Sequence, residues 1–473
     1  MELSFRAKSL NNIAPILSGV QKKLPAFLQL LVERILRSQL ACRFLKGALW
    51  VTFGSVISRG LGLLASVAVA RILGKERYGE IGIIQNTVVM LTTFAGFGLG
   101  MAATKFVAEC RNSDPLKAGR VLALASAVTL ATSGAASLLL FFAAPWVSAH
   151  ALSAPQLTEA VRIAAVLLFF SGLNSVQLSA LSGFEAFRAI ARINILCGAM
   201  NFPLMLGATY YWGLTGALWT FVVTAASNCL LTQIALREEC HRAGIIYSYR
   251  GFWPERAVLA RFSLPVFVSG LSGTCADWIL NATLVKQPNG FSELGLFNAA
   301  RQWNALMIFV PGMLAALTLP VLSNLRGEGN FSQFKKILLF NSFLLSALAV
   351  AVAVPVACFA KPIMGLYGHQ FAAGWPILMI NCFYCVLYSS SIVVGQAMWS
   401  MNLVKEGVAF AIGRSLLILL LWNLLKGKGA TGMAWTYCLT FVIQTICLIP
   451  YVWCRADRLF HSGKQPPALL IGL

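Results

Sequence analysis

Acidic side chains are scarce in this sequence: Asp and Glu number 16 among 473 residues, and all charged residues make up 11%. A soluble domain carries about 25% charged residues, so a soluble fold is disfavoured. The four histidines are scattered and form no H-E-x-x-H pattern or triad-like cluster. We therefore expect neither an enzyme active site nor a metal site.

A disulfide framework is also missing. The 12 cysteines lie in apolar runs or in basic segments, such as those that hold Cys42, Cys110 and Cys240. Such a distribution is unlike that of secreted, disulfide-linked domains. Cys382 and Cys385 have C-x-x-C spacing, but they fall inside an apolar run, where we expect them to pack rather than to bind metal or undergo redox chemistry.

Apolar residues are abundant: they make up 58% of the chain, and the mean hydropathy is +0.75. Apolar runs of membrane-spanning length recur from end to end. A backbone in lipid must pair its own N–H and C=O groups, so these runs are predicted to be helices. We expect an all-α polytopic membrane protein of about 12 transmembrane helices. The predicted spans are 47–70, 81–104, 121–144, 159–182, 193–212, 214–236, 262–285, 293–320, 337–360, 374–399, 406–425 and 430–453.

Basic residues indicate the orientation of these spans. The chain carries 37 Lys and Arg and a net charge of +21, and most of the basic residues fall in alternate connections between spans. This bias is typical of cytoplasmic loops, so we expect both termini in the cytoplasm and no role in nucleic-acid binding. Residues 1–46 are predicted to be a basic cytoplasmic segment, amphipathic from Pro25 to Lys46 and lying on the lipid surface.

The chain also repeats itself. Gly-x-Thr-Gly-x-x-Trp-Thr begins at Gly213 and again at Gly429, 216 positions later. Tyr78-Gly79-Glu80-Ile81-Gly82 matches the segment from Phe291 to Gly295, 213 positions later. The repeats predict two parallel six-helix bundles, at 47–237 and 262–455, joined by a cytoplasmic linker at 238–261 and followed by a tail at 456–473. A central cavity is expected between them.

Charged residues deep in the predicted spans are the candidates for function. A charge at mid-bilayer costs at least about 2.5–3.5 kcal/mol unless it has a partner or a wet cavity. Arg59 lies roughly 18 Å into its span and Arg301 roughly 12 Å into another at 1.5 Å per residue, and Arg414 is similarly deep. Asp277 is the one acidic residue well inside a span. It is predicted either to form a structural ion pair with Arg301 or to couple transport to protons or sodium ions.

Three amides accompany these charges. Gln85 and Asn86 lie in the second span, and Asn298 lies in the matching part of the eighth, one turn before Arg301. Amides commonly link membrane helices by hydrogen bonds. They are equally suited to line a cavity, and both interpretations remain open.

The segments Ser58-Arg59-Gly60-Leu61-Gly62 and Ala70-Arg71-Ile72-Leu73-Gly74, followed by Tyr78-Gly79, resemble the start of bacterial polysaccharide flippases. These are the O-antigen and exopolysaccharide repeat-unit translocases of the multidrug/oligosaccharidyl-lipid/polysaccharide exporter superfamily. The basic N-terminal extension departs from that pattern.

The resemblance implies a V-shaped pair of bundles in the bacterial inner membrane, similar to MATE transporters. It implies an undecaprenyl-diphosphate-linked oligosaccharide as cargo, with cationic residues in the cavity, for which Arg59 and Arg301 are suitably placed. A polysaccharide polymerase and glycosyltransferases are the implied partners. No cofactor is expected beyond a coupling ion.

Two other functions fit parts of the sequence. A multidrug exporter would carry cations and would need acidic and aromatic cavity residues, whereas only Asp277 offers a deep carboxylate. A membrane polymerase or ligase acting on lipid-linked sugars would need catalytic residues in a sizeable outer loop. The predicted loop from Trp146 to Glu159 holds one His and no Lys or Arg.

Overall fold

The computed structural model describes residues 39–111, 113–245 and 256–461, and the regular structure within these ranges is helical. Most of the predicted amphipathic segment lies outside the described residues, and its last residues belong to α4, which begins at Gln39. The centre of the predicted linker and the end of the predicted tail also lie outside them.

The described residues of the N-terminal half form five α-helices. Two of them, α4 and α8, bend sharply at a glycine, Gly74 and Gly213, and so cross the bundle twice. A break at Phe97 and Gly98, both with positive φ, separates α4 from α5 within the second pass. The helices are α4 (Gln39–Gly96), α5 (Leu99–Cys110), α6 (Pro115–Trp146), α7 (Thr158–Gly183) and α8 (Phe187–Arg242), with short turns η1 (Val147–Ala151) and η2 (Pro155–Leu157).

The C-terminal half has the same order of passes. Its second pass is divided into three helices, which the sequence predicted as one continuous span. The helices are α9 (Arg256–Val285), α10 (Gly290–Gln302), α11 (Asn304–Met307), α12 (Phe309–Gly327), α13 (Phe331–Cys358), α14 (Ala360–Leu366), α15 (Trp375–Ser400), α16 (Val404–Leu425) and α17 (Gly429–His461), with turns η4 (His369–Gly374) and η5 (Lys426–Lys428).

Eight helical stretches of the described chain are long and apolar enough to cross a membrane by length and composition. Three of these contain two passes each: α4, α8, and the pair α16 and α17 joined by η5. Together with α9 they give twelve passes, six in each half, as predicted. Large apolar side chains on the outside are well exposed, including Leu139, Phe142 and Phe343, each at least 70% exposed, as expected for a surface in lipid.

The internal repeat is visible in the backbone. Gly213 and Gly429 have nearly the same conformation, φ 57° with ψ −133° and φ 58° with ψ −138°, which an L side chain would strain. Glu185 and Asn402, at the matching turns before α8 and α16, both have a φ of 59°. The repeat found in the sequence therefore coincides with turns of matching conformation and with the same order of passes in the two halves.

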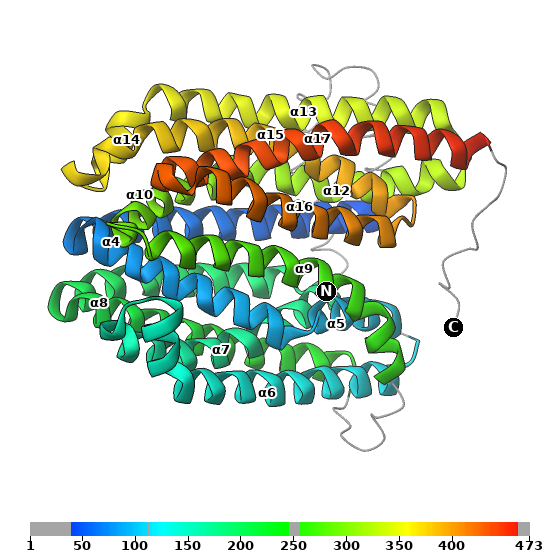
Figure 1. Ribbon diagram of the computed structural model, residues 1–473. Helices are drawn as coiled ribbons and strands as arrows, with labels where there is room; N and C mark the ends of the chain where they lie inside the picture. Colours follow the sequence, from blue (N-terminus) through cyan, green and yellow to red (C-terminus); the bar gives the residue numbers. More distant parts are fainter. Residues whose placement is uncertain (1–38, 112, 246–255, 462–473) are drawn as a thin grey trace, which may run out of the picture.

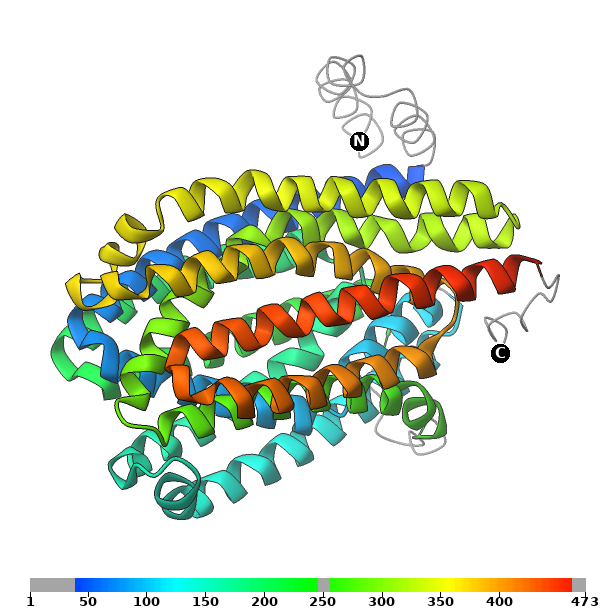
Figure 2. The same cartoon turned by 45° about the horizontal axis from the view of Figure 1, so that its top comes forward.

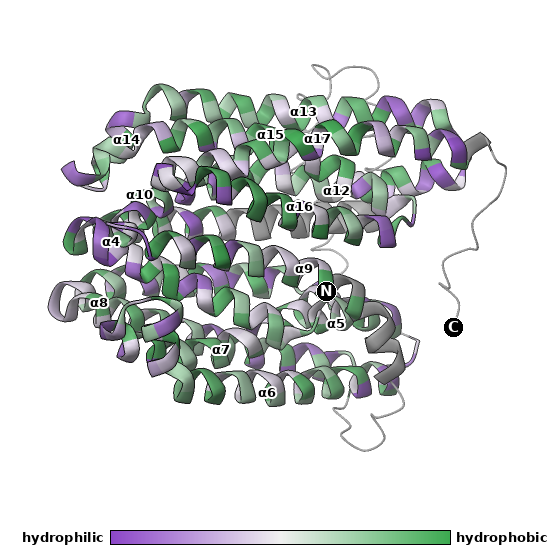
Figure 3. Cartoon of the chain, viewed as in Figure 1, coloured by the Kyte–Doolittle hydropathy of each residue, from purple (hydrophilic) through white to green (hydrophobic). Residues whose placement is uncertain are grey.

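Figure 1 shows how the halves are arranged, with α5 to α8 on one side, α13, α15 and α17 on the other, and α4, α9 and α10 between them. The first residues of α4 and the last of α17 lie at the same end of the bundle (Figure 2). Figure 3 shows apolar residues dominating the long helices and polar residues gathered towards their ends. The halves meet chiefly where α4 packs on α9 and α10.

Candidate functional site

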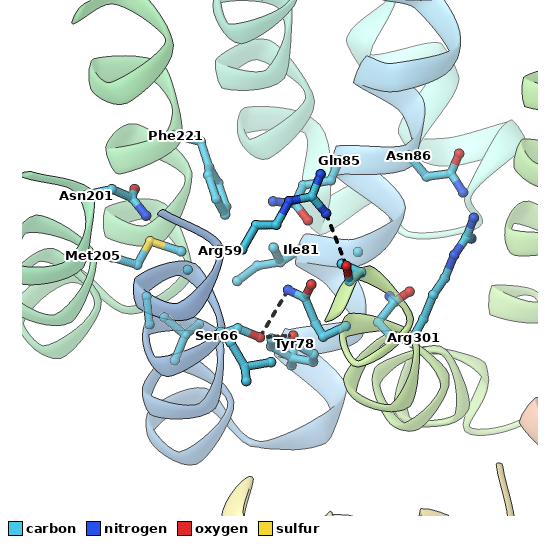
Figure 4. A pocket seen from close by; sticks show the side chains of 18 of the residues that line it. Arg59, Ser66, Tyr78, Ile81, Gln85, Asn86, Asn201, Met205, Phe221 and Arg301 are labelled. Carbon is cyan, nitrogen blue, oxygen red and sulfur yellow. Dashed lines mark hydrogen bonds between the residues drawn. The ribbon is translucent and has the colours of Figure 1, made fainter. Parts of the chain in front are cut away.

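A cavity of about 540 Å³ lies between the two halves, with walls from α4, α8, α9, α10 and α11 (Figure 4). It has the size typical of small-molecule sites. All but one of the site residues predicted from the sequence line it, whichever half they come from. These are Arg59, Gln85, Asn86, Asp277, Asn298 and Arg301.

Arg59 extends from the first leg of α4 towards the opposite half. Its Nη1 donates to Ala305 O at 3.3 Å, and its guanidinium lies over the Phe309 ring, 5.1 Å from the centroid. Among the described carboxylates, none lies within ion-pair distance of this guanidinium. The Arg59 charge is thus held by a carbonyl and a ring face and is left available to a ligand.

Asp277 joins α9 to α10 and α17. Tyr437 Oη donates to Asp277 Oδ1 at 2.8 Å, and Arg301 Nη2 lies 3.4 Å from Asp277 Oδ2. The Arg301 guanidinium also lies over the Tyr437 ring at 5.6 Å. The predicted proximity of Asp277 and Arg301 is confirmed by this contact. Arg301 remains 43% exposed, so part of its guanidinium faces the cavity.

Amide and hydroxyl groups complete the lining near the bend of α4. Gln302 Nε2 donates to Ser66 Oγ at 3.2 Å, and this oxygen lies 2.6 Å from Tyr78 Oη. Figure 4 shows this hydrogen-bonded group on one side of the cavity, below Arg59. Since Gln302 belongs to one half and Ser66 and Tyr78 to the other, the group links the two halves at this end.

Beside this group the two halves touch backbone to backbone. A Cβ on Gly79 would lie 1.8 Å from Phe291 O, and a Cβ on Gly295 would lie 1.9 Å from Lys75 O. Only glycine allows helices to approach this closely. These contacts between α4 and α10, the glycine seam, close the cavity at the end of the bundle that contains Gly74.

Arg414 does not line this cavity. It lies on α16, with its guanidinium over the Phe441 ring at 5.8 Å, in a separate groove of about 310 Å³ between α16 and α17. A Cβ on Gly273 would lie 3.4 Å from Arg414 Nη2, so the guanidinium contacts α9 one turn away from Asp277. Its predicted depth in the membrane made Arg414 a candidate cavity residue. Arg414 lies, however, on a face of α16 that lines the second groove and not the cavity that contains Arg59 and Arg301.

The sequence analysis missed the three lining residues that α8 supplies. Asn201 and Met205 lie on the first leg of α8 and Phe221 on the second. An amide beside Pro203 was the available signal for Asn201, but single apolar residues in a span carry none. Gln302 and Tyr437 were missed as well, because their roles depend on which helices meet.

The described residues contain no group of three His, Cys, Asp or Glu that could hold a metal ion. Cys382 and Cys385 are both buried in the core of the C-terminal half. The chemistry of the cavity is instead that of binding: two guanidinium groups, one carboxylate, several amides and no arrangement of nucleophile and base. A membrane protein of two helical repeats around a polar cavity belongs structurally to the class of alternating-access transporters.

Comparisons with known proteins place the chain within that class. A solved multidrug resistance MATE family transporter of the MOP superfamily, in an inward-facing conformation, has the same fold, with a TM-score of 0.72 at 16% identity over 87% of this chain and 97% of that one. The family described as "Polysaccharide biosynthesis protein" matches residues 44–326. The chain belongs to this family.

Two curated relatives are similar over most of their length. The EPS I polysaccharide export inner membrane protein EpsE of Ralstonia nicotianae is 24% identical over 86% of this chain and 93% of its own. The lipid III flippase of Escherichia coli K12 is 22% identical over 87% of this chain and 99% of its own. The resemblance noted at the motifs around Arg59 and Arg71 is confirmed by these matches.

Proposed function

We propose that this protein is a flippase that carries undecaprenyl-diphosphate-linked oligosaccharide units from the inner to the outer leaflet of a bacterial cytoplasmic membrane. It acts as a transporter and not as an enzyme, and it delivers the oligosaccharide units from which surface polysaccharide or exopolysaccharide is made. The observation that carries the proposal is the cavity between the halves, in which Arg59 and Arg301 face a common space. A diphosphate is the kind of anion that guanidinium groups bind through paired hydrogen bonds.

The structure favours this cargo over a cationic drug. Asp277 is the only acidic residue in the lining of the cavity, and it is already engaged by Arg301 and Tyr437. A cationic substrate would therefore meet two guanidinium groups and no free carboxylate. The names of the relatives, a polysaccharide export protein and a lipid III flippase, support the same choice.

A polymerase or ligase is disfavoured by the segment from Trp146 to Glu159. It folds into the short turns η1 and η2. There the ring of His150 stacks on Trp146, and the backbone carbonyl oxygen of His150 accepts a hydrogen bond from Lys286. No described nucleophile or carboxylate pairs with His150 there.

The first test is binding and flipping of the substrate. Arg59→Ala and Arg301→Ala are each expected to lower substrate affinity by about 10- to 100-fold, because a hydrogen bond to a charged group contributes about 1.5–3 kcal/mol. Replacement by Lys at either position should restore part of the affinity, since Lys keeps the positive charge but cannot form the paired hydrogen bonds of a guanidinium group. Flipping is measured in proteoliposomes as protection of a fluorescent lipid-linked oligosaccharide from a membrane-impermeant reagent.

The matched control is Arg162→Ala. Arg162 pairs with Glu159 and stacks near Phe141, outside the cavity, so its loss should leave flipping unchanged. Normal flipping by both Arg59→Ala and Arg301→Ala would refute the proposed function. Efflux of a cationic dye by the wild-type protein, without flipping, would favour the drug exporter instead.

We further propose that both termini lie in the cytoplasm and that a polymerase and glycosyltransferases act in the same pathway. The excess of basic residues in alternate connections supports this orientation. Reporter fusions after Arg250 should be cytoplasmic and fusions near Ser153 should be exposed on the far side. The reverse pattern would overturn the orientation but not the fold.

A further inference from the structure

The positive charge of the cavity is gathered on one side. Arg59 belongs to the N-terminal half, yet its guanidinium contacts Ala305 and Phe309 of the C-terminal half. Arg301 is held by Asp277 and Tyr437, also of the C-terminal half. A diphosphate bound by both guanidinium groups must therefore lie against the wall formed by α9, α10 and α11.

The opposite wall is neutral and is formed by α8. Figure 4 shows Asn201, Met205 and Phe221 together on one side of Arg59, with Arg301 on the other. The bend at Gly213 returns the second leg of α8 alongside the first, so that Thr224 Oγ1 donates to Asn201 Oδ1 at 3.1 Å. The amide oxygen of Asn201 is thereby engaged, and its Nδ2 has no protein acceptor among the described residues.

An amide donor beside an aromatic ring suits a neutral, hydroxyl-rich ligand. The Asn201 amide can donate to a hydroxyl or ring oxygen, and the flat apolar face of Phe221 can cover the C–H face of a pyranose. No charged side chain other than Arg59 comes from this half of the lining, so a second anion has no partner here. The first sugar is bonded directly to the diphosphate. With the diphosphate against α9, α10 and α11, we expect this sugar on the α8 side of the same cavity.

We propose that Asn201 and Phe221 bind the sugar residue directly joined to the diphosphate, while Arg59 and Arg301 hold the diphosphate itself. This inference rests on the proposed function. It divides one cavity into an anion side, formed by the C-terminal half together with Arg59, and a sugar side, supplied by α8. The sugar side then sets which glycan is accepted, because a site built to hydrogen-bond a hydroxyl rejects ligands that lack it.

The test compares two kinds of probe on the full-length protein in nanodiscs. One is undecaprenyl diphosphate without sugar, and the other is undecaprenyl diphosphate carrying glucose, galactose, N-acetylglucosamine or N-acetylgalactosamine. Wild-type protein is expected to bind at least one glycosylated probe about 10-fold more tightly than the bare diphosphate, as expected for a hydrogen bond and an aromatic contact together. Asn201→Leu and Phe221→Ala should each reduce this preference to about twofold or less, with unchanged affinity for the bare probe.

Matched controls separate a sugar site from general damage. Asn228 on α8 resembles Asn201 in accepting a hydrogen bond from a threonine hydroxyl, that of Thr232. Phe170 packs against the same hydrophobic core as Phe221. Neither Asn228 nor Phe170 lines the cavity. Asn228→Leu and Phe170→Ala should keep the sugar preference. Asn201→Gln and Phe221→Leu are the milder variants if the first pair unfolds.

The outcomes are distinct. A preserved sugar preference in the Asn201 and Phe221 variants, or equal weakening of both probes with unchanged thermal stability, would overturn the sugar site and leave the flippase proposal intact. Absence of any preference in the wild-type protein would do the same. If Arg59→Ala and Arg301→Ala bind the bare diphosphate normally, the proposed function itself fails.

Discussion

The two halves of the molecule share one order of helical passes and differ in their chemistry. At the C-terminal ends of their second passes, Arg111 Nη1 donates to Gly183 O and Arg326 Nη1 donates to Ser400 O, at matching places of the repeat. Asp114 and Asn330 cap α6 and α13 in the same way, each by accepting from the backbone N–H three residues on. The helical unit thus tolerates exchange of an acid for an amide where only a cap is needed.

Within the cavity the halves diverge. The C-terminal half supplies a network of Asp277, Arg301 and Tyr437, whereas the N-terminal half supplies Arg59 and uncharged groups. The fold fixes where the cavity lies, and the side chains of each half decide what that half can bind. Three substitutions test this division between shared scaffold and separate chemistry.

The largest effect is expected at the glycine seam, where matching glycines have unequal neighbours. A Cβ on Gly295 would meet Lys75 O, a backbone atom, at 1.9 Å, whereas a Cβ on Gly82 would meet the movable side-chain nitrogen of Asn298 at 1.8 Å. Gly295→Ala should lower the free energy of unfolding by about 3 kcal/mol, since overpacking forces the backbone to shift. Gly82→Ala should lower the free energy of unfolding by clearly less, because the side chain of Asn298 can move aside.

Thermal unfolding in detergent and flipping in proteoliposomes measure both variants. Gly312→Ala is the control, because a Cβ there meets nothing within 4 Å. Equal losses for Gly295→Ala and Gly82→Ala would show that the seam is looser than its geometry indicates.

The second-largest loss of stability is expected at the turn before α8, which carries Glu185 where the matching turn before α16 carries Asn402. Glu185 pairs with Arg111, and their side chains are 14% and 16% exposed, whereas the matching residue Asn402 is neutral. Glu185→Asn makes the N-terminal turn resemble its twin and should destabilise the protein by about 2 kcal/mol, because Arg111 loses a largely buried partner. Asn tolerates the positive φ of this position, so backbone strain does not add to the loss.

Chemical or thermal unfolding gives the size of this change. Glu238→Gln, which removes an exposed pair with Arg242, is the control and should change stability by less than about 1 kcal/mol. A neutral result for Glu185→Asn would mean that the carbonyl of Gly183 alone is enough for Arg111.

The smallest change in stability is expected at Asp277. The pair with Arg301 is partly exposed, so Asp277→Asn should cost about 1 kcal/mol after screening by solvent. We propose, however, that Asp277 couples transport to a proton or sodium gradient, because a change in its charge would release Arg301 and Tyr437 together. Asp277→Asn should then bind substrate but flip it at a rate that no longer responds to the gradient.

Transport in proteoliposomes with and without a pH or sodium gradient decides this point. A merely structural pair predicts instead that Asp277→Asn/Arg301→Gln recovers stability. A stable double variant that still responds to the gradient would remove Asp277 as the coupling residue.

Much of this architecture could be predicted from the sequence, because hydropathy and the requirement for internal backbone hydrogen bonds determine the passes. Depth in the membrane correctly brought Arg59, Arg301 and Asp277 to one cavity. It failed for Arg414, since depth does not say which side of a helix a residue occupies. Asn201 and Phe221 escaped prediction because only the bend of α8 brings them to the cavity. Tyr437 escaped because only the packing of α17 on α10 brings it to Asp277 and Arg301.

The glycine seam also bears on how easily the cavity can open. At Gly79 and Gly295, where α4 meets α10, backbone lies directly against backbone, and beside them the side chain of Asn298 packs on Gly82. Contacts of this kind gain their energy from dispersion at short range, of which about a quarter to a half is lost over 0.5–1 Å of separation. The strength of the seam at Gly79 and Gly295 therefore depends on the close fit of two backbone surfaces rather than on particular side-chain pairs.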